Sequence, residues 1–148
     1  MSFQQNSTID TISNYIKTNL IPSVVDIRTT NIYDHELTDL AGFPAATITL
    51  QDITGKTLDN ARNERIYAFS VRIFIDRNKQ NFGSNKTEGI LRTMANNFIL
   101  LVDADPSLGG NVIWARAFNI KLGYVNRESN NLRLFEVTLE VTDAITYR

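Results

Sequence analysis

Two long segments in which apolar and polar residues alternate close the chain, Val112–Val125 and Leu132–Thr142. Alternation with a period of two is typical of β-strands that bury one face. The residues between them, Arg127–Asn131, favour a turn, so the two segments predict a hairpin. Fully extended, the first segment would reach about 45 Å. A compact domain of 148 residues is only about 38 Å across. The hairpin must therefore bend, twist or project, and a projecting sheet usually meets a neighbouring subunit.

The first of these segments is predicted to turn its large apolar side chains to the core. Its apolar face would hold Val112, Trp114, Phe118, Ile120, Leu122 and Tyr124, with Arg116 intruding, and its other face Ala115, Ala117, Asn119 and Lys121. An RNA-stacking platform would instead need exposed aromatic side chains beside Lys or Arg on one sheet face. The alternation favours a row that faces the core.

The remaining elements follow from periodicity and from turn residues. A capping box at Ser7 and Asp10 predicts a helix that runs to Leu20 and ends at Pro22. The other predictions are a short strand over 24–27, a polar loop over 31–42, a strand over 46–50, a polar stretch over 52–64, a strand over 65–76 and a second helix over 84–102. The strand over 65–76 is apolar on both faces, which predicts cover on both faces, including by another subunit.

These elements predict an α+β fold in a single domain over residues 1–148. The expected architecture is a mostly antiparallel, twisted sheet with a long C-terminal hairpin, packed against two α-helices. No stretch approaches the roughly 18 consecutive apolar residues that a membrane helix needs. The N-terminus lacks the order of a signal peptide, so we expect a cytoplasmic protein with no membrane partner.

Candidate catalytic and metal sites are weak throughout the chain. There is no cysteine, and His35 is the single histidine, so a transition-metal shell around Asp34, Glu36 and Asp39 would be incomplete. The start of a calcium loop at 103–107 fails because Trp114 stands where the bidentate glutamate belongs. No phosphate-binding loop, dinucleotide fingerprint or nucleophile elbow is present. We therefore expect no enzyme, no metal and no cofactor.

Charge is divided unevenly along the chain. Residues 1–60 hold three basic and seven acidic residues, whereas residues 61–148 hold twelve basic and nine acidic ones. This imbalance is too small for a dedicated nucleic-acid binder. It suits a protein whose acidic side meets the basic side of another copy, and it suits equally well two solvated faces that happen to differ.

The order of the predicted elements resembles the tail terminator family of long-tailed bacteriophages, also called tail completion or head–tail joining proteins. The likeness spans the whole chain and rests on its length, on this order and on local sequence. The segments that carry it are Ile9–Leu20 before Pro22, Phe43–Ile48 leading into a strand, Tyr67–Ile73 before a helix, and the closing Phe135–Leu139.

The resemblance implies a structural virion protein that forms a homohexameric ring on the tail tube and stops tube growth. The ring would receive the head-completion, or stopper, protein on its other side, and DNA would pass through its lumen without sequence-specific binding. Such a protein is assembled in the host cytoplasm and ends in the virion tail or neck. Asp59, Arg62 and Arg65 are then candidates for contacts with the tube or a neighbouring subunit, and Asp34, Glu36 and Asp39 for an acidic lumen loop.

Two alternatives stay open. One is another ring protein of the phage neck or tail, or its counterpart in a phage-derived particle. The other is a dimeric α+β domain that binds a ligand or RNA and uses the long hairpin as its dimer interface.

Overall fold

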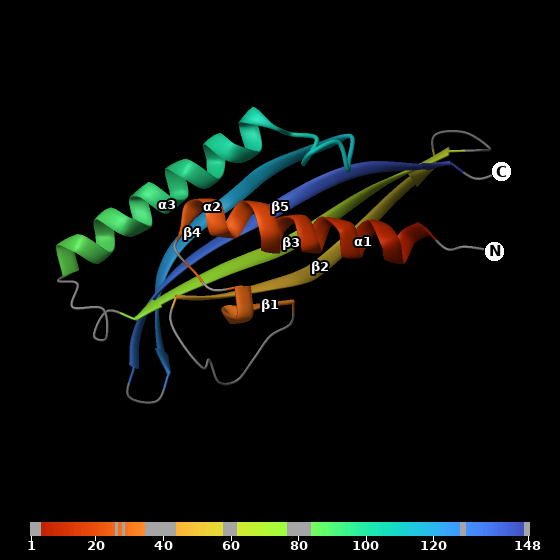
Figure 1. Ribbon diagram of the computed structural model, residues 1–148. Coiled ribbons are helices and arrows are strands. Elements are labelled where there is room, and N and C mark those ends of the chain that lie inside the picture. The colour runs from red at the N-terminus through yellow and green to blue at the C-terminus, as the bar shows by residue number, and fades with distance from the viewer. Residues whose placement is uncertain are drawn as a thin grey trace.

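The computed structural model describes residues 4–25, 27, 29–34, 44–57, 62–76, 84–127 and 130–146. In chain order the elements are α1 (Gln4–Tyr15), a π-helical segment (Ile16–Leu20), α2 (Ile21–Val24), a 3-10 turn (Thr29–Asn31), β1 (Ile32–Tyr33), β2 (Ala45–Thr57), β3 (Arg62–Asp76), α3 (Ser84–Ala104), β4 (Trp114–Arg127) and β5 (Asn130–Thr146) (Figure 1). The predicted α+β class is confirmed.

One sheet holds the five strands of the described residues, in the order β1-β2-β3-β5-β4. β1 pairs with β2 in parallel and every other neighbouring pair is antiparallel. The last strand in the sequence, β5, thus lies inside the sheet, and β4 forms an edge. The predicted hairpin is β4–β5, and its far end turns away from the body of the sheet (Figure 1).

The N-terminal helical run differs from its prediction at both ends. It begins at Gln4, before the expected cap at Ser7, and it continues through Pro22 to Val24. Proline lacks an N–H and its ring collides with a carbonyl of the preceding α-helical turn. Here the preceding turn is π-helical, and the N–H of Ile21 bonds to the carbonyl of Ile16. We attribute the tolerance of Pro22 to this wider turn and to its place at the start of α2.

The predicted strand over 24–27 is wrong, because Val24 ends α2 and neither Val25 nor Ile27, the other described residues there, belongs to a strand. The first short strand is β1, inside the stretch predicted to be a polar loop. The polar stretch over 52–64 is also strand at both ends, since β2 continues to Thr57 and β3 begins at Arg62. β2 and β3 form a hairpin in which Asn63 pairs with Thr57. This cross-strand pairing outweighs the low intrinsic strand preference of the polar residues in the stretch.

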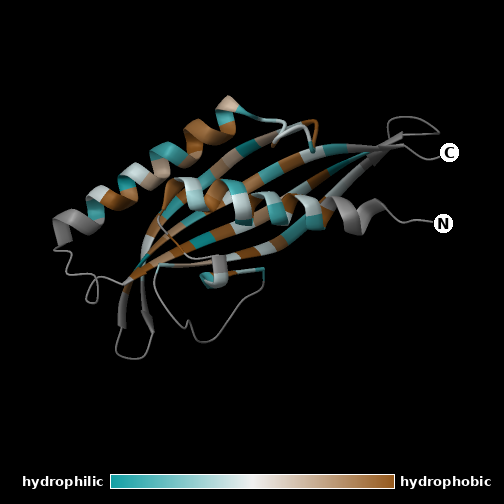
Figure 2. Cartoon of the chain, viewed as in Figure 1, coloured by the Kyte–Doolittle hydropathy of each residue, from teal (hydrophilic) through white to brown (hydrophobic). Residues whose placement is uncertain are grey.

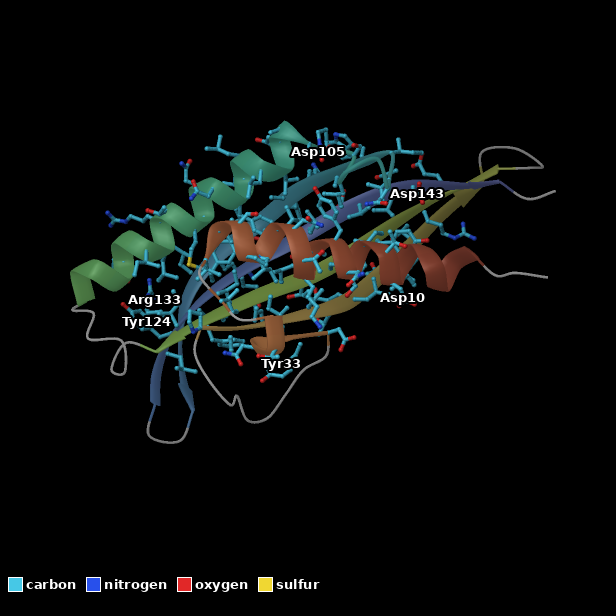
Figure 3. All side chains as sticks on the ribbon, viewed as in Figure 1. Asp10, Tyr33, Asp105, Tyr124, Arg133 and Asp143 are labelled. Carbon is cyan, nitrogen blue, oxygen red and sulfur yellow. The ribbon has the colours of Figure 1, made fainter. Side chains whose placement is uncertain are left out.

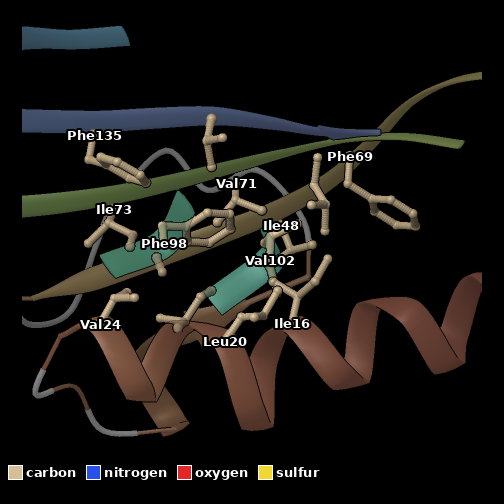
Figure 4. Packing of buried hydrophobic residues seen from close by; sticks show 14 of the residues in the cluster. Ile16, Leu20, Val24, Ile48, Phe69, Val71, Ile73, Phe98, Val102 and Phe135 are labelled. Carbon is tan, nitrogen blue, oxygen red and sulfur yellow. The ribbon is translucent and has the colours of Figure 1, made fainter. Parts of the chain in front are cut away.

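The core lies on the face of the sheet that the helices cover, which we call the helix-covered face. Ile16 and Leu20 of the N-terminal helical run and Phe98 and Val102 of α3 meet side chains of β2, β3 and β5 there (Figure 4). From the sheet this cluster includes Ile48, Tyr67, Phe69, Val71, Ile73, Phe135, Val137, Leu139 and Val141. The rings of Phe98 and Phe135 lie 5.8 Å apart between α3 and β5. Alternation along β3 and β5 produces this face (Figure 2).

The opposite face, which we call the open face, is set by the register. It carries Thr47, Thr49 and Asp52 of β2, Ser70, Arg72 and Phe74 of β3, Trp114, Arg116, Phe118 and Lys121 of β4, and Glu136, Thr138 and Glu140 of β5. The prediction that β3 is covered on both faces fits Ser70 and Phe74, which are both buried. Because this burial is present within a single copy, it needs no second subunit.

Candidate protein–protein interface

A β-bulge in β4 decides which of its side chains face solvent. Phe118 pairs with Thr138 and Lys121 with Glu136, so β4 has one extra residue between these two pairs. Asn119 lies in the bulge with a φ of 56°, a left-handed conformation that asparagine tolerates better than most residues. An extra residue reverses the alternation of the strand beyond it.

The predicted core-facing row over Val112–Val125 is wrong for Trp114 and Phe118, whereas Val112 lies in the core and Ile120 packs against it. Trp114 and Phe118 lie on the open face and are 43% and 47% exposed. Ala115, which the alternation placed outside, is buried on the helix-covered face instead. Small side chains at this level leave room for α3 to pack against β4. The aromatic residues expected in the core are therefore available to a partner.

Arg116 joins the two exposed aromatic rings into one cluster, the Trp114–Phe118 cluster. Its guanidinium carbon lies 5.7 Å from the ring centroid of Trp114 and 4.9 Å from that of Phe118. Its Nη2 is 3.1 Å from Oε1 of Glu140 on β5. Cation–π contacts at exposed sites contribute only about 0.5–1 kcal/mol each. Their main effect here is to hold the two rings in a fixed arrangement on an edge strand.

The neighbouring strands continue the open face with a second ion pair. Nε of Arg72 on β3 donates to Oε2 of Glu136 on β5 at 2.6 Å. Glu136 and Glu140 are therefore partly buried and paired with arginines. Arg72 and Arg116 each have a carboxylate close by, so these two pairs add no net charge to the open face.

A polar junction fixes the end of α3 against α1. The carboxylate of Asp105 accepts hydrogen bonds from Ser107 Oγ at 2.8 Å, from the N–H of Gly109 at 2.8 Å and from the hydroxyl of Tyr15 at 3.4 Å. The first two of these bonds hold the pKa of Asp105 below its ordinary value. Burial and the nearby carboxylate raise the pKa of Tyr15. A Cβ at Gly109, where φ is 71°, would lie 3.0 Å from the Tyr15 ring. Asp105 thus shapes a turn rather than a calcium site.

A second polar contact is buried below the start of α3. Nη2 of Arg133 on β5 lies 2.6 Å from Oε1 of Glu88 on α3, and its Nη1 donates to the carbonyl of Gly123 at 2.9 Å. The ring of Tyr124 stacks 4.0 Å from its guanidinium carbon, and Figure 3 shows the two side chains together. Arg133 is only 5% exposed. The contact ties the hairpin to α3 where the hairpin begins to turn away.

Three of the six predicted site residues lie in parts of the chain that the structure leaves undescribed. Asp59, Glu36 and Asp39 lie outside the described residues, as does His35. Arg62 pairs through its backbone with Thr146 in β5. The predicted roles of these residues stay predictions.

Arg65 is the predicted contact residue that the structure places most fully. It lies in β3 on the helix-covered side, between Gly55 of β2 and Asp143 of β5. Its guanidinium extends across Gly55, where an added Cβ would come within 2.9 Å of Nη1. Gly55 therefore provides the space through which the Arg65 side chain reaches the β2 side of the sheet.

Asp34 follows β1 and is exposed. With Asp10, Ser13 and Asn14 of α1 and Lys17 of the π-helical segment it lines an open hollow of about 260 Å³. Figure 3 shows Asp10 on α1 above Tyr33 of β1. Within the described ranges, no three metal-ligating side chains gather, and no helix is long and apolar enough to cross a membrane.

Comparison with known proteins gives structural likenesses but no sequence match. No protein-family profile and no curated protein matches the chain. Among solved structures, a chain from the virion of a native gene transfer agent particle is similar, with a TM-score of 0.45 and 9% sequence identity. The match covers 95% of this chain and 98% of that one.

Proposed function

We propose that this protein is a structural subunit that assembles through its sheet, and that it belongs to the tail of a phage-like particle. The observation that carries the proposal is the exposed Trp114–Phe118 cluster on an edge strand of the open face. Exposed aromatic side chains that gather with arginine are enriched at protein–protein interfaces. The element order that resembles tail terminators supports the particle setting.

In its full form the proposal is a homohexameric ring that caps the tail tube, ends tail elongation and receives the head-completion protein. Asp59, Arg62 and Arg65 would contact the tube or the next subunit, and the segment with Asp34, Glu36 and Asp39 would line the lumen. An acidic lumen would repel the phosphates of passing DNA and so let it slide. The role is structural rather than catalytic.

Native mass spectrometry of the purified protein, with and without assembled tail tubes imaged by negative stain, tests the proposal. We expect a hexamer in solution, or a monomer that becomes a six-fold cap at the ends of tubes. A stable dimer that does not bind tubes would end the proposal.

Charge reversal tests the tube contact. Arg62→Glu is compared with Arg92→Glu, which reverses an exposed charge on α3. Only the first variant should lose tube binding.

A second candidate function is supported by the same open face. Trp114 and Phe118 are exposed beside Arg116 and Lys121, an arrangement that can stack single-stranded bases. The carboxylates of Glu136 and Glu140 on the same face oppose it, because they neutralise the basic side chains. Fluorescence anisotropy with a labelled oligo-uridine distinguishes the two. Binding that falls in Phe118→Ala and weakens with salt would favour RNA, whereas no binding leaves the structural role.

A further inference from the structure

The sheet has two edges that no described strand covers. β1 pairs only with Ala46 and Thr47, so the rest of β2 has no described neighbour on that side. β4 pairs with β5 alone and forms the opposite edge. Uncovered edges present rows of backbone donors and acceptors, and proteins either block them or pair them with another chain.

The two edges carry opposite charges at the same level of the sheet. Asp52 of β2 pairs with Ala68 of β3, and Ala68 pairs with Glu140 of β5. Glu140 in turn pairs with Arg116 of β4. Asp52 and Arg116 are thus at opposite ends of one row across the sheet, both on the open face and both exposed. If a second copy continued the sheet in line, its Asp52 would lie next to Arg116.

Side-chain size is also complementary across these edges on the helix-covered face. Ile53 is in the same row as Ala115, and Leu50 is in the same row as Ala117. Ile53 and Leu50 are exposed at the β2 edge, 44% and 37%. A neighbouring copy would set these two branched side chains beside two alanines.

The open face repeats this complementarity with aromatic residues. Trp114 is in the row of Thr54, and Phe118 is in the row of Thr49. Aromatic residues next to β-branched ones are favourable cross-strand pairs. Four successive matches of size and type, together with the charge match, cover the length of β4 before its bulge.

We propose that β4 of one copy pairs with the Thr49–Thr54 segment of β2 in a second copy, so that the sheets of neighbouring subunits join. Strand directions alternate from β2 through β3 and β5 to β4, so in-line continuation makes this contact antiparallel. A two-fold contact between two β4 strands would instead bring like charges together at Arg116. The bulge of β2 between Leu50 and Asp52 restricts which strands can pair there.

The contact joins two different surfaces, so repeating it gives a ring or an open filament. Four long strands occupy about 19 Å at about 4.8 Å per strand, so six copies give a wall about 115 Å around and about 37 Å across. This size rests on the hexamer proposed above, whereas the strand contact itself does not.

Paired cysteines test the contact directly, because the natural chain contains none. In the double variant Asp52→Cys/Arg116→Cys the two positions lie three strands apart in one chain, about 14 Å. A disulfide needs Cα atoms within about 7 Å, so any bond must link two copies. Thr54→Cys/Trp114→Cys tests the same register two residues away. Asp52→Cys/Arg92→Cys, whose second cysteine lies on α3, is the matched control.

We expect both edge pairs, but not the control, to form covalent multimers on oxidation, in a ladder that stops at six chains. An unlimited ladder would support the strand contact and contradict the hexamer. A hexamer in native mass spectrometry with no crosslink from either pair would overturn the contact and leave the ring. If Arg116→Cys alone formed disulfide-linked dimers, and the double variant formed dimers in place of longer multimers, a β4–β4 contact would replace the proposed one.

Charge reversal provides a second test of the same contact. Asp52→Arg should weaken self-association about tenfold or more, and Asp52→Asn far less.

Discussion

The two faces of the sheet use the same strands for different purposes. On the helix-covered face, Phe69, Val71, Phe135 and Val137 alternate into a core that α1 and α3 close. On the open face, the same strands present Arg72 and Glu136 as an ion pair, and β4 adds two exposed aromatic residues. One face thus holds the fold together, and the other is available for contact. Changes on the first should cost stability, and changes on the second should cost assembly.

Substitution of one buried and one exposed phenylalanine should give the largest difference in stability. Phe98→Ala removes a fully buried ring from between α3 and β5 and should lower the free energy of unfolding by about 3–5 kcal/mol. Phe118→Ala on the open face should lower it by less than about 1 kcal/mol. Urea unfolding followed by circular dichroism measures both. Equal losses would mean that the open face also supports the fold.

An intermediate effect is expected at the buried arginine. Glu88→Gln keeps the size of the side chain and removes the carboxylate that faces Arg133 at 2.6 Å. We expect a loss of about 1–3 kcal/mol, because a buried cation would lose its charged partner. Glu140→Gln removes a carboxylate from the exposed Arg116 and serves as the control, with a loss below about 1 kcal/mol. If Glu140→Gln lost as much stability as Glu88→Gln, burial would not explain why one ion pair contributes more than the other.

The smallest effect is a pH dependence at the junction of α1 and α3. The pKa of Asp105 is lowered in the folded protein, so its carboxylate stabilises the fold above the ordinary value of 3.8, and this contribution is lost as pH falls below it. Melting temperatures of the natural chain should therefore drop more steeply on acidification than those of Asp105→Asn. Parallel curves would show that the hydrogen bonds from Ser107 and Gly109 do not favour the ionised form.

The sequence predicted the elements whose periodicity is long and regular. The helix from Ser84, the strand over 65–76 and the closing hairpin are all present, because each has enough apolar repeats to define one buried face. The predictions failed where local rules met tertiary context. Pro22 lies within a helical run because a π-turn precedes it, and the polar residues around Gly55 extend strands because neighbouring strands pair with them.

The candidate interface could not be read from the sequence for a related reason. Trp114 and Phe118 have the spacing of a core-facing row, and only the register against β5 turns them outward. Asn119 is the one local signal of the bulge, since asparagine accepts positive φ, but many asparagines lie in regular strands. The contact between Tyr15 and Asp105 likewise joins residues ninety positions apart in the chain.

By itself the sequence determined the class of the fold, the positions of the long elements and the lack of cysteine, because periodicity and composition are properties of the chain alone. The tertiary structure decided which face of β4 meets solvent, where β5 lies in the sheet and which charges stand in one row at its two edges. These features follow from strand register, and register is fixed by side chains packing across the whole sheet rather than by neighbours in sequence.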